Sequence, residues 1–173
     1  MKRHIFLTGE IQVGKSTAIR RFLALSELTA DGFMSHISDS ENGRELYIAR
    51  FDSVLGETDR TLAARVRFPN FEVYSGVFDT LGAELIRDSG RRDIIVIDEL
   101  GRMEENSPVF KAAVFEKLGG GTPIVGVVKK AGSAFLDGVR AHPNAEILAV
   151  TRENRGAIPS LLAERFARVT AGR

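Results

Sequence analysis

The most informative stretch of this 173-residue sequence is Gly9-Glu10-Ile11-Gln12-Val13-Gly14-Lys15-Ser16. It matches the phosphate-binding loop pattern GxxxxGK followed by Ser or Thr at every fixed position. The glycines let the backbone curl until successive N–H groups point at phosphate oxygens, and the helix that follows adds its positive N-terminal end. An apolar run at residues 4–8 precedes the loop and an amphipathic segment follows it, which is the order that the motif requires.

Two side chains of this loop have chemistry of their own. Lys15 can reach the β- and γ-phosphates of a bound nucleotide, and the Ser16 hydroxyl can ligate Mg²⁺. The alternative is a glycine turn with an exposed lysine, but a chance match in a chain of this length occurs roughly once in a hundred sequences. We expect a nucleotide to contact Gly9, Glu10, Ile11, Gln12, Val13, Gly14, Lys15, Ser16 and Thr17.

A second segment, Ile94-Ile95-Val96-Ile97-Asp98-Glu99, has four apolar residues that end in two carboxylates. A buried parallel strand would deliver Asp98 to its C-terminal edge, where open α/β sheets bind ligands. There Asp98 can hold Mg²⁺ beside Ser16, and Glu99 can polarise a water for in-line attack on the γ-phosphate. The alternative for Glu99 is a solvated acid or an ion-pair partner at a helix terminus.

The remaining chain alternates short apolar runs with helical patterns, which is typical of strands joined by crossover helices. Continuous apolar runs at 94–97, 124–128 and 147–150 predict parallel strands covered on both faces. Helical spacing predicts helices carried by residues 19–26, 73–85, 107–118 and 154–166, with Ser107 as an N-cap. Short strands within residues 31–70 predict an antiparallel insertion. We therefore expect an α/β three-layer sandwich with a mostly parallel central sheet, an antiparallel insertion at its edge, and a single domain over residues 1–173.

The composition excludes several classes of protein. Lys and Arg number 24 and Asp and Glu 23, so the chain lacks the basic excess of a dedicated nucleic-acid binder. There is no cysteine, which excludes disulfides, thiolate metal sites and cysteine nucleophiles. No apolar stretch approaches the roughly 20 residues of a membrane span, and no cleavage site follows the start, so we expect a cytoplasmic protein. His4, His36 and His142 have no metal-ligand spacing.

The segment VIDELGRMEENSPVFKAAV, residues 96–114, resembles the run Asp-Glu-Ile-Gly-Lys-Met-Glu, then Ser-Pro and a helix, of a family of small P-loop nucleoside-triphosphatases. The loop, Asp31-Gly32-Phe33 and residues 150–155 extend this resemblance over nearly the whole chain. It implies Mg²⁺-dependent hydrolysis of ATP, GTP, CTP and UTP to diphosphate and phosphate with little base selectivity. It also implies that Gly9, Gly14, Lys15, Ser16 and Thr17 bind phosphate and metal, and that Asp98 and Glu99 are the metal-binding and water-activating acids.

Three positions leave alternatives open. Arg102 stands where the family often has lysine, so it either stabilises transition-state charge or forms a surface ion pair with Glu104 or Glu105. Lys129-Lys130 stand where the family tends to have a histidine and then basic residues; Lys129 either contacts phosphate or both lysines are solvated, which we favour. Asn154-Arg155 either lie near the nucleotide base or begin a capped helix.

Two other functions use the same loop. A nucleotide kinase would need an acceptor pocket and an arginine-rich lid, for which the insertion offers Arg44, Arg50, Arg60, Arg65 and Arg67. An ATP- or GTP-dependent adaptor would bind without turnover, but an acid such as Glu99 beside the metal aspartate argues against it. We expect nucleoside triphosphates as the ligands, no membrane or nucleic-acid partner, and a monomer.

Overall fold

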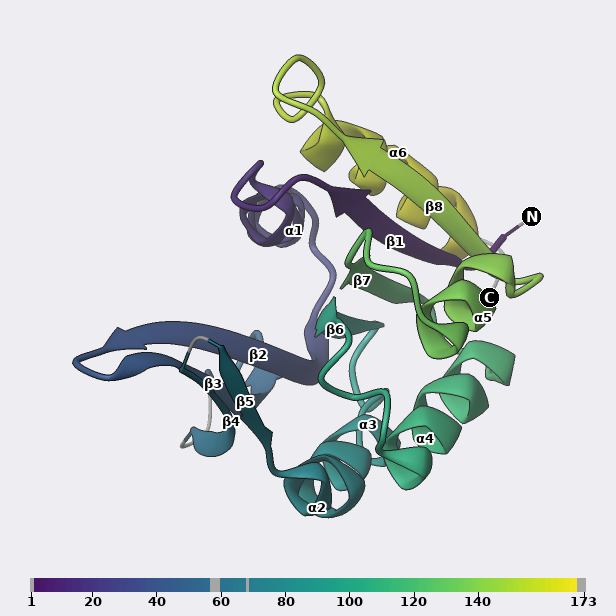
Figure 1. Ribbon diagram of the computed structural model, residues 1–173. Coiled ribbons are helices and arrows are strands. Elements are labelled where there is room, and N and C mark those ends of the chain that lie inside the picture. Colours follow the sequence, from purple (N-terminus) through teal and green to yellow (C-terminus); the bar gives the residue numbers. More distant parts are fainter. Residues whose placement is uncertain (1, 57–59, 68, 171–173) are drawn as a thin grey trace.

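The computed structural model describes residues 2–56, 60–67 and 69–170, which form one eight-stranded sheet with helices on both faces (Figure 1). The strand order is β5-β4-β3-β2-β6-β7-β1-β8. In chain order the elements are β1 (His4–Gly9), α1 (Lys15–Leu25), β2 (Ala30–Ser40), β3 (Gly43–Asp52), β4 (Thr61–Arg67), β5 (Asn70–Val73), α2 (Ser75–Val77), the π-helical turn η1 (Phe78–Gly82), α3 (Ala83–Arg87), β6 (Ile94–Leu100), α4 (Pro108–Gly119), β7 (Ile124–Val128), α5 (Ala134–Ala141), β8 (Ala145–Val150) and α6 (Ile158–Thr170).

The sheet has a parallel part and an antiparallel part that share β2. Strands β2, β6, β7, β1 and β8 are parallel neighbours, whereas β3, β4 and β5 continue the sheet in antiparallel fashion from the other side of β2. The α/β class with a mostly parallel sheet and antiparallel strands at its edge is therefore confirmed. The expectation that residues from 31 onward are wholly antiparallel is wrong, because Asp31 pairs in parallel with Ile95 of β6.

Successive side chains of the central strands pack into two hydrophobic cores, one on each face of the sheet. Along β1, Ile5 and Leu7 pack with Phe22 of α1 and Phe166 of α6, while Phe6 between them joins the core on the opposite face. A strand sends successive side chains to opposite faces, so an uninterrupted apolar run fills both cores. Helices α1 and α6 cover one face, and α3, α4 and α5 cover the other, which confirms the three layers.

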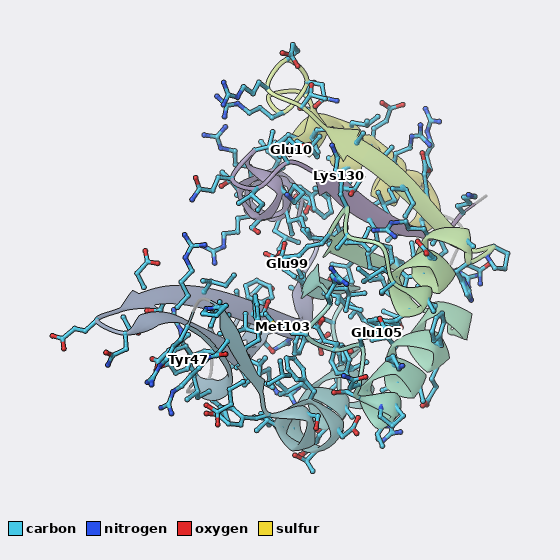
Figure 2. All side chains as sticks on the ribbon, in the orientation of Figure 1. Glu10, Tyr47, Glu99, Met103, Glu105 and Lys130 are labelled. Carbon is cyan, nitrogen blue, oxygen red and sulfur yellow. The ribbon has the colours of Figure 1, made fainter. Side chains whose placement is uncertain are left out.

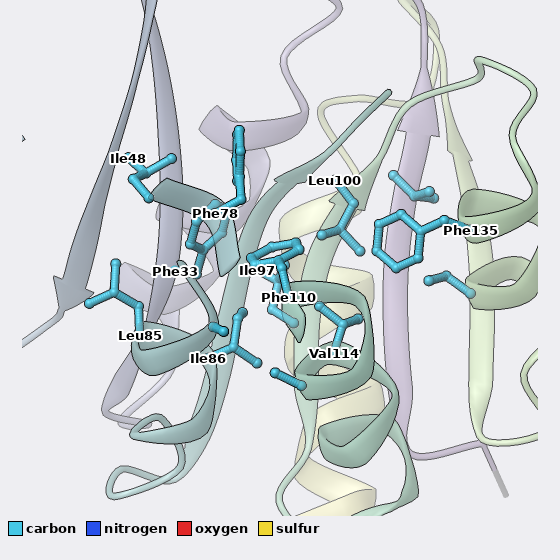
Figure 3. Packing of buried hydrophobic residues seen from close by; sticks show 14 of the residues in the cluster. Phe33, Ile48, Phe78, Leu85, Ile86, Ile97, Leu100, Phe110, Val114 and Phe135 are labelled. Carbon is cyan, nitrogen blue, oxygen red and sulfur yellow. The ribbon is translucent and has the colours of Figure 1, made fainter. Parts of the chain in front are cut away.

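The second core is built around aromatic rings. Phe110 of α4 lies 5.1 Å from Phe33 of β2 and 5.8 Å from Phe78 of η1, measured between ring centroids. Figure 3 shows these rings gathered around Ile97 of β6, with Leu85 and Ile86 of α3 below them in this view. Full burial of such a side chain contributes about 1.5–3 kcal/mol. Ile97 of β6, which directly precedes Asp98 and Glu99, therefore shares one core with Phe110 of α4.

Several predicted boundaries are wrong. Val73 ends β5 instead of beginning a helix, and the last helix begins at Ile158, four residues after Asn154. Neither β5 nor α5 was predicted. Helix α5 has only eight residues, so its apolar face amounts to Phe135, Leu136 and Val139. In the described part of the chain, no helix combines the length and the hydrophobicity needed to cross a membrane.

The N-terminus of α4 is capped by a residue from another element. Ser107 precedes the helix as expected, but its side chain makes no capping hydrogen bond and its Oγ is buried without a partner. Instead, Asp79 Oδ1 of η1 accepts hydrogen bonds from the backbone N–H groups of Val109 at 2.9 Å and Phe110 at 3.1 Å. An acid at this position also interacts favourably with the helix dipole, so η1 and α4 are joined at the start of the helix.

Candidate active site

The loop that matches the phosphate-binding pattern connects β1 to α1 and needs glycine at both of its ends. A Cβ at Gly9 would lie 2.4 Å from the carbonyl oxygen of Val150 on the neighbouring strand, so no larger residue fits there. Gly14 has φ 107° and ψ 24°, a left-handed conformation that L-residues with a side chain rarely adopt. The loop therefore turns sharply at Gly14 into the first residue of α1, Lys15.

The Lys15 side chain folds back into the loop. Its Nζ donates hydrogen bonds to the carbonyl oxygens of Gly9 at 3.0 Å and Glu10 at 2.7 Å, and the residue is only 8% exposed. Burial lowers the pKa of Lys15, while the nearby carboxylates of Glu99 and Asp98 act in the opposite direction. An ammonium has three N–H donors. Two of them donate to these loop carbonyls, and the third can donate to a different acceptor.

Ser16 and Asp98 meet as expected. The Ser16 hydroxyl donates a 3.0 Å hydrogen bond to Asp98 Oδ1, which joins the start of α1 to the end of β6. Burial raises the pKa of Asp98 to about 6, and the Glu99 charge adds to this, whereas the Ser16 hydrogen bond lowers it. A carboxylate in this position is costly to ionise, so a cation that approached it would be bound favourably.

Glu99 is paired with a lysine from the next strand. Its Oε1 lies 2.7 Å from Lys129 Nζ, just beyond the end of β7, and the two side chains are 23% and 36% exposed. The backbone N–H of Glu99 donates to Ser35 Oγ of β2 at 3.3 Å. Figure 2 shows Glu99 facing the opening between the β2–β3 hairpin and α1, with Glu10 and Lys130 beyond it. For Lys129, the favoured interpretation as a solvated lysine is therefore wrong.

A cleft of about 700 Å³ contains most of these groups, a volume within the range of small-molecule sites. Its walls come from the loop, from Glu99, from residues 129–131, and from Ile37 and Arg44 of the hairpin. Of the predicted site residues, the cleft lining includes Gly9, Glu10, Ile11, Gln12, Gly14, Lys15, Ser16, Thr17 and Glu99, and Asp98 reaches it through Ser16. Arg102 is exposed and does not line the cleft.

A second hollow of about 530 Å³ adjoins the cleft at the loop, because the two share the lining residues 10–12 and Lys130. It is lined by residues 10–13, Lys130, residues 150–153 and Arg155. Asn154 does not line it, because its amide holds the turn together: Oδ1 accepts from the Thr151 N–H at 2.8 Å, and Nδ2 donates to the Ala149 carbonyl at 2.8 Å. Val13 of the predicted binding loop lines this hollow instead of the cleft. Of Asn154 and Arg155, only Arg155 lines the hollow.

Sequence reasoning considered Glu104 only as a possible surface ion-pair partner of Arg102, and the structure buries it instead. The residue is 2% exposed, and its Oε2 accepts a 2.9 Å hydrogen bond from the Gly101 N–H. Burial raises the pKa of Glu104 to about 7, against the backbone hydrogen bonds and the charge of Lys129. Glu104 and Glu105 are adjacent identical acids in the sequence, so no pattern marks the first as the buried one. No ion pair joins Arg102 to either acid in the part of the chain that the structure describes.

Comparison with known proteins shows the family. Residues 4–163 match the model of a protein family described as NTPase. The human cancer-related nucleoside-triphosphatase is 31% identical over 90% of this chain and 92% of its own length. Nucleoside-triphosphatase THEP1 of Natranaerobius thermophilus is 26% identical over 94% of this chain and 96% of its own length.

Two solved structures share the fold. The solution structure of a human cancer-related nucleoside triphosphatase superposes with a TM-score of 0.70 at 26% identity, covering 99% of both chains. The crystal structure of THEP1 from the hyperthermophile Aquifex aeolicus gives a TM-score of 0.72 at 22% identity, over 94% of this chain and 98% of that one. Because the family match spans most of the sequence and the human relative covers nine-tenths of it, this chain belongs to the NTPase family.

Proposed function

We propose that this protein hydrolyses nucleoside 5′-triphosphates to diphosphate and phosphate, with Mg²⁺ and with little preference among bases. The observation that carries the proposal is the convergence of Lys15, the Ser16–Asp98 pair and Glu99 on one cleft. These are a phosphate-binding cation, a pair of oxygen ligands and a carboxylate that can accept a proton. Membership of a family whose named relatives are nucleoside-triphosphatases supports the same reaction.

The loop supplies phosphate binding. The first turn of α1 presents unsatisfied backbone N–H groups and the positive end of the helix dipole to an anion. Lys15 is already oriented by the Gly9 and Glu10 carbonyls, so its remaining donor can meet a phosphate oxygen with little loss of side-chain freedom. The same ammonium then stabilises the charge that develops on the phosphates during transfer.

The oxygens of Ser16 and Asp98 fit a magnesium ion. Mg²⁺ is usually held by one or two protein ligands together with substrate phosphates and waters, and the described residues contain no cluster of three or more His or acidic side chains that would make a closed protein cage. The raised pKa of the buried Asp98 gives a further reason for a cation at this point. Bound there, Mg²⁺ would neutralise the β- and γ-phosphate oxygens.

Glu99 is the proposed base. In-line attack requires a carboxylate within hydrogen-bond reach of a water beside the γ-phosphate, and Glu99 is the acid of β6 that lines the cleft. The exposed Arg102 lies outside that lining, so we do not assign it the transition-state role that was one of its two alternatives.

Weak base selectivity follows from what surrounds the second hollow. Tens-fold discrimination between bases generally needs buried polar groups matched to one base edge. The Asn154 amide is occupied by the backbone of its own turn. The polar side chains that line the hollow are exposed instead of buried, and its two guanidinium groups, those of Arg152 and Arg155, can stack on any base.

A nucleotide kinase is the second candidate, because Arg44 lines the cleft. Other arginines of the insertion are engaged elsewhere: Arg50 pairs with Asp88 at 3.4 Å and Arg65 with Glu45 at 3.1 Å. The two functions are separated by incubating the purified protein with each Mg²⁺–nucleoside triphosphate, with and without nucleoside monophosphates. We expect phosphate release without an acceptor. Diphosphate formation only when an acceptor is present would support the kinase, and tight binding without products would support an adaptor.

A further inference from the structure

In the part of the chain that the structure describes, the cations that line the cleft are Lys15, Arg44, Lys129 and Lys130. The three lysines are bonded to groups that line the cleft themselves, namely carbonyls of the loop, the Glu99 carboxylate and the Glu10 carboxylate. Arg44 differs, because its partner is Asp39, which does not line the cleft. Arg44 can therefore turn towards a ligand without releasing any other group of the site.

The hairpin of β2 and β3, which carries Arg44, reaches past the end of β6. Strand β2 pairs with β6 as far as Met34, opposite Asp98, whereas its pairing with β3 continues to Ser40. Figure 1 shows the hairpin extending beyond the carboxyl end of β6, where it forms one wall of the cleft. Arg44 pairs with Asp39 of β2 on one side and with Val66 of β4 on the other. Its backbone is thus part of a three-stranded sheet, and its side chain is the part that can reorient.

One face of the hairpin is turned towards Glu99. Ser35, Ile37 and Asp39 alternate along β2 and so share this face. Arg44 lies directly opposite Asp39 in the antiparallel pairing, which places it on the same face. Ser35 Oγ accepts a 3.3 Å hydrogen bond from the Glu99 N–H, and Ile37 lines the cleft. This row of side chains therefore leads from the proposed base to Arg44.

The contact between Arg44 and Asp39 is easily exchanged. Arg44 Nε lies 3.2 Å from Asp39 Oδ1, and the two side chains are 65% and 87% exposed. An ion pair as exposed as this contributes little to stability. A guanidinium presents a planar fork of donors that matches two phosphate oxygens, so a phosphoryl group in the cleft is a better partner than a solvated carboxylate.

We propose that Arg44 is a catalytic residue that stabilises the charge of the γ-phosphoryl group during its transfer to water. This inference rests on the proposed function. Glu99 takes a proton from water while the water oxygen bonds to the γ-phosphorus. The bond from that phosphorus to the bridging oxygen breaks, and this oxygen leaves with the diphosphate and keeps the electron pair. Charge is spread over the phosphoryl oxygens in such a transition state, and catalysis consists almost entirely of positioning and electrostatic stabilisation. Lys15 meets these oxygens from the loop, and Arg44 meets them from the hairpin.

Kinetics separate transition-state stabilisation from ground-state binding. The kcat and KM for phosphate release, and the dissociation constant of a non-hydrolysable β,γ-imido ATP analogue with Mg²⁺, are measured for the wild type, Arg44→Ala and Arg44→Lys. In Arg44→Ala we expect kcat to fall at least a hundredfold, while the dissociation constant of the analogue changes by less than about threefold. Arg44→Lys should restore only part of kcat, because an ammonium lacks the planar fork.

Two variants of the neighbouring strands are the controls. Asp39→Asn breaks the same ion pair but keeps the guanidinium, and Arg67→Ala removes an exposed cation of β4 that does not line the cleft. Both should keep kcat within about threefold of the wild type, and thermal unfolding shows whether each variant is folded. A folded Arg44→Ala protein with kcat within threefold of the wild type, or an equal loss in Asp39→Asn, would overturn the inference.

Aluminium fluoride tests the inference without requiring hydrolysis, because with Mg²⁺–ADP it mimics the phosphoryl group in transfer. The wild type should bind ADP at least about tenfold more tightly when aluminium fluoride is present. Arg44→Ala should lose this gain and keep its affinity for ADP alone. A wild type without the gain, or an Arg44→Ala protein that retains it, would overturn the inference. A wild type that shows the gain but releases no phosphate would instead contradict the proposed hydrolysis alone.

Discussion

Ser16 Oγ donates a 3.0 Å hydrogen bond to Asp98 Oδ1, and this contact joins residues 82 positions apart in the sequence. It links the loop to β6, so a phosphate held by the one lies beside the carboxylate of the other. We expect Asp98→Asn to lower Mg²⁺-dependent kcat/KM by at least a hundredfold, because an amide keeps the shape but loses the charge that attracts the ion.

The matched measurement for Asp98→Asn is nucleotide binding in EDTA, which should remain within about threefold of the wild type because Lys15 and the loop are unchanged. Isothermal titration with and without Mg²⁺ provides both values. Equal losses in the two conditions would show that Asp98 supports the loop rather than the metal.

Lys15→Ala should remove most activity and leave the fold intact. The ammonium donates to two loop carbonyls and not to core groups of the described residues, so its loss should cost about 1.5–3 kcal/mol in stability. Its absence from the transition state should cost on the order of 10²–10³ in kcat/KM. Phosphate release and thermal unfolding measured on the same preparation provide the test. A folded variant with near-normal turnover would remove the basis for the loop assignment.

Glu99→Gln and Arg102→Ala form a contrasting pair. Glutamine cannot accept a proton, so we expect kcat to fall at least a hundredfold while triphosphate binding is retained. Arg102 is exposed and lies outside the cleft lining, so its removal should change kcat/KM by less than about threefold. Steady-state kinetics on both variants measures kcat and kcat/KM and so tests both expectations. A large loss in Arg102→Ala would favour the alternative in which Arg102 stabilises transition-state charge.

Glu104 should make stability depend on pH. Burial raises the pKa of Glu104 from 4.5 to about 7 in the folded protein. A raised acid pKa contributes stability that is complete below the unfolded value near 4.5 and is lost as the pH rises through about 7. Glu104→Gln keeps an oxygen for the Gly101 N–H but cannot titrate. Its stability relative to the wild type should therefore increase from pH 4.5 to 8, by up to about 3 kcal/mol.

Urea denaturation of the nucleotide-free protein at several pH values gives this difference, and Asp98 contributes equally to both proteins. If the difference in free energy of unfolding between the wild type and Glu104→Gln stays constant from pH 4.5 to 8, the pKa of Glu104 is not raised by burial. The comparison also needs Glu105→Gln as its control, since it alters the adjacent acid of the same turn.

The fold and the site were not equally predictable. The loop, Asp98 and the apolar strands were found from sequence because backbone geometry and two-sided burial constrain those residues locally. The double role of β2 was missed, since its partners β3 and β6 differ in direction and strand pairing leaves no local signal. The Asp79 cap of α4 was missed for a similar reason, because the capping acid comes from η1 instead of the preceding residue.

The cationic side of the site was predicted least well. Lys129 and Arg102 are both basic residues that follow an apolar strand, and only the tertiary fold sends the first to Glu99 and the second to the surface. Long charged side chains take their orientation from neighbours that lie far away in sequence. Glu104 shows the same limit, because the fold buries it and leaves the adjacent Glu105 less buried.

We expect base selectivity to depend on the second hollow. In the proposed function, Lys15 and the loop N–H groups would recognise phosphates, which all four nucleotides share, and the Asn154 amide is occupied by Thr151 and Ala149. We therefore expect ATP, GTP, CTP and UTP to have specificity constants within about tenfold, which corresponds to about 1.4 kcal/mol of differential binding. Competition between pairs of nucleotides at equal concentration measures these ratios directly. Arg155→Ala should weaken all four nucleotides to a similar extent, because a guanidinium stacks on any base. A preference above a hundredfold for one base that disappears in this variant would show that Arg155 reads a base edge.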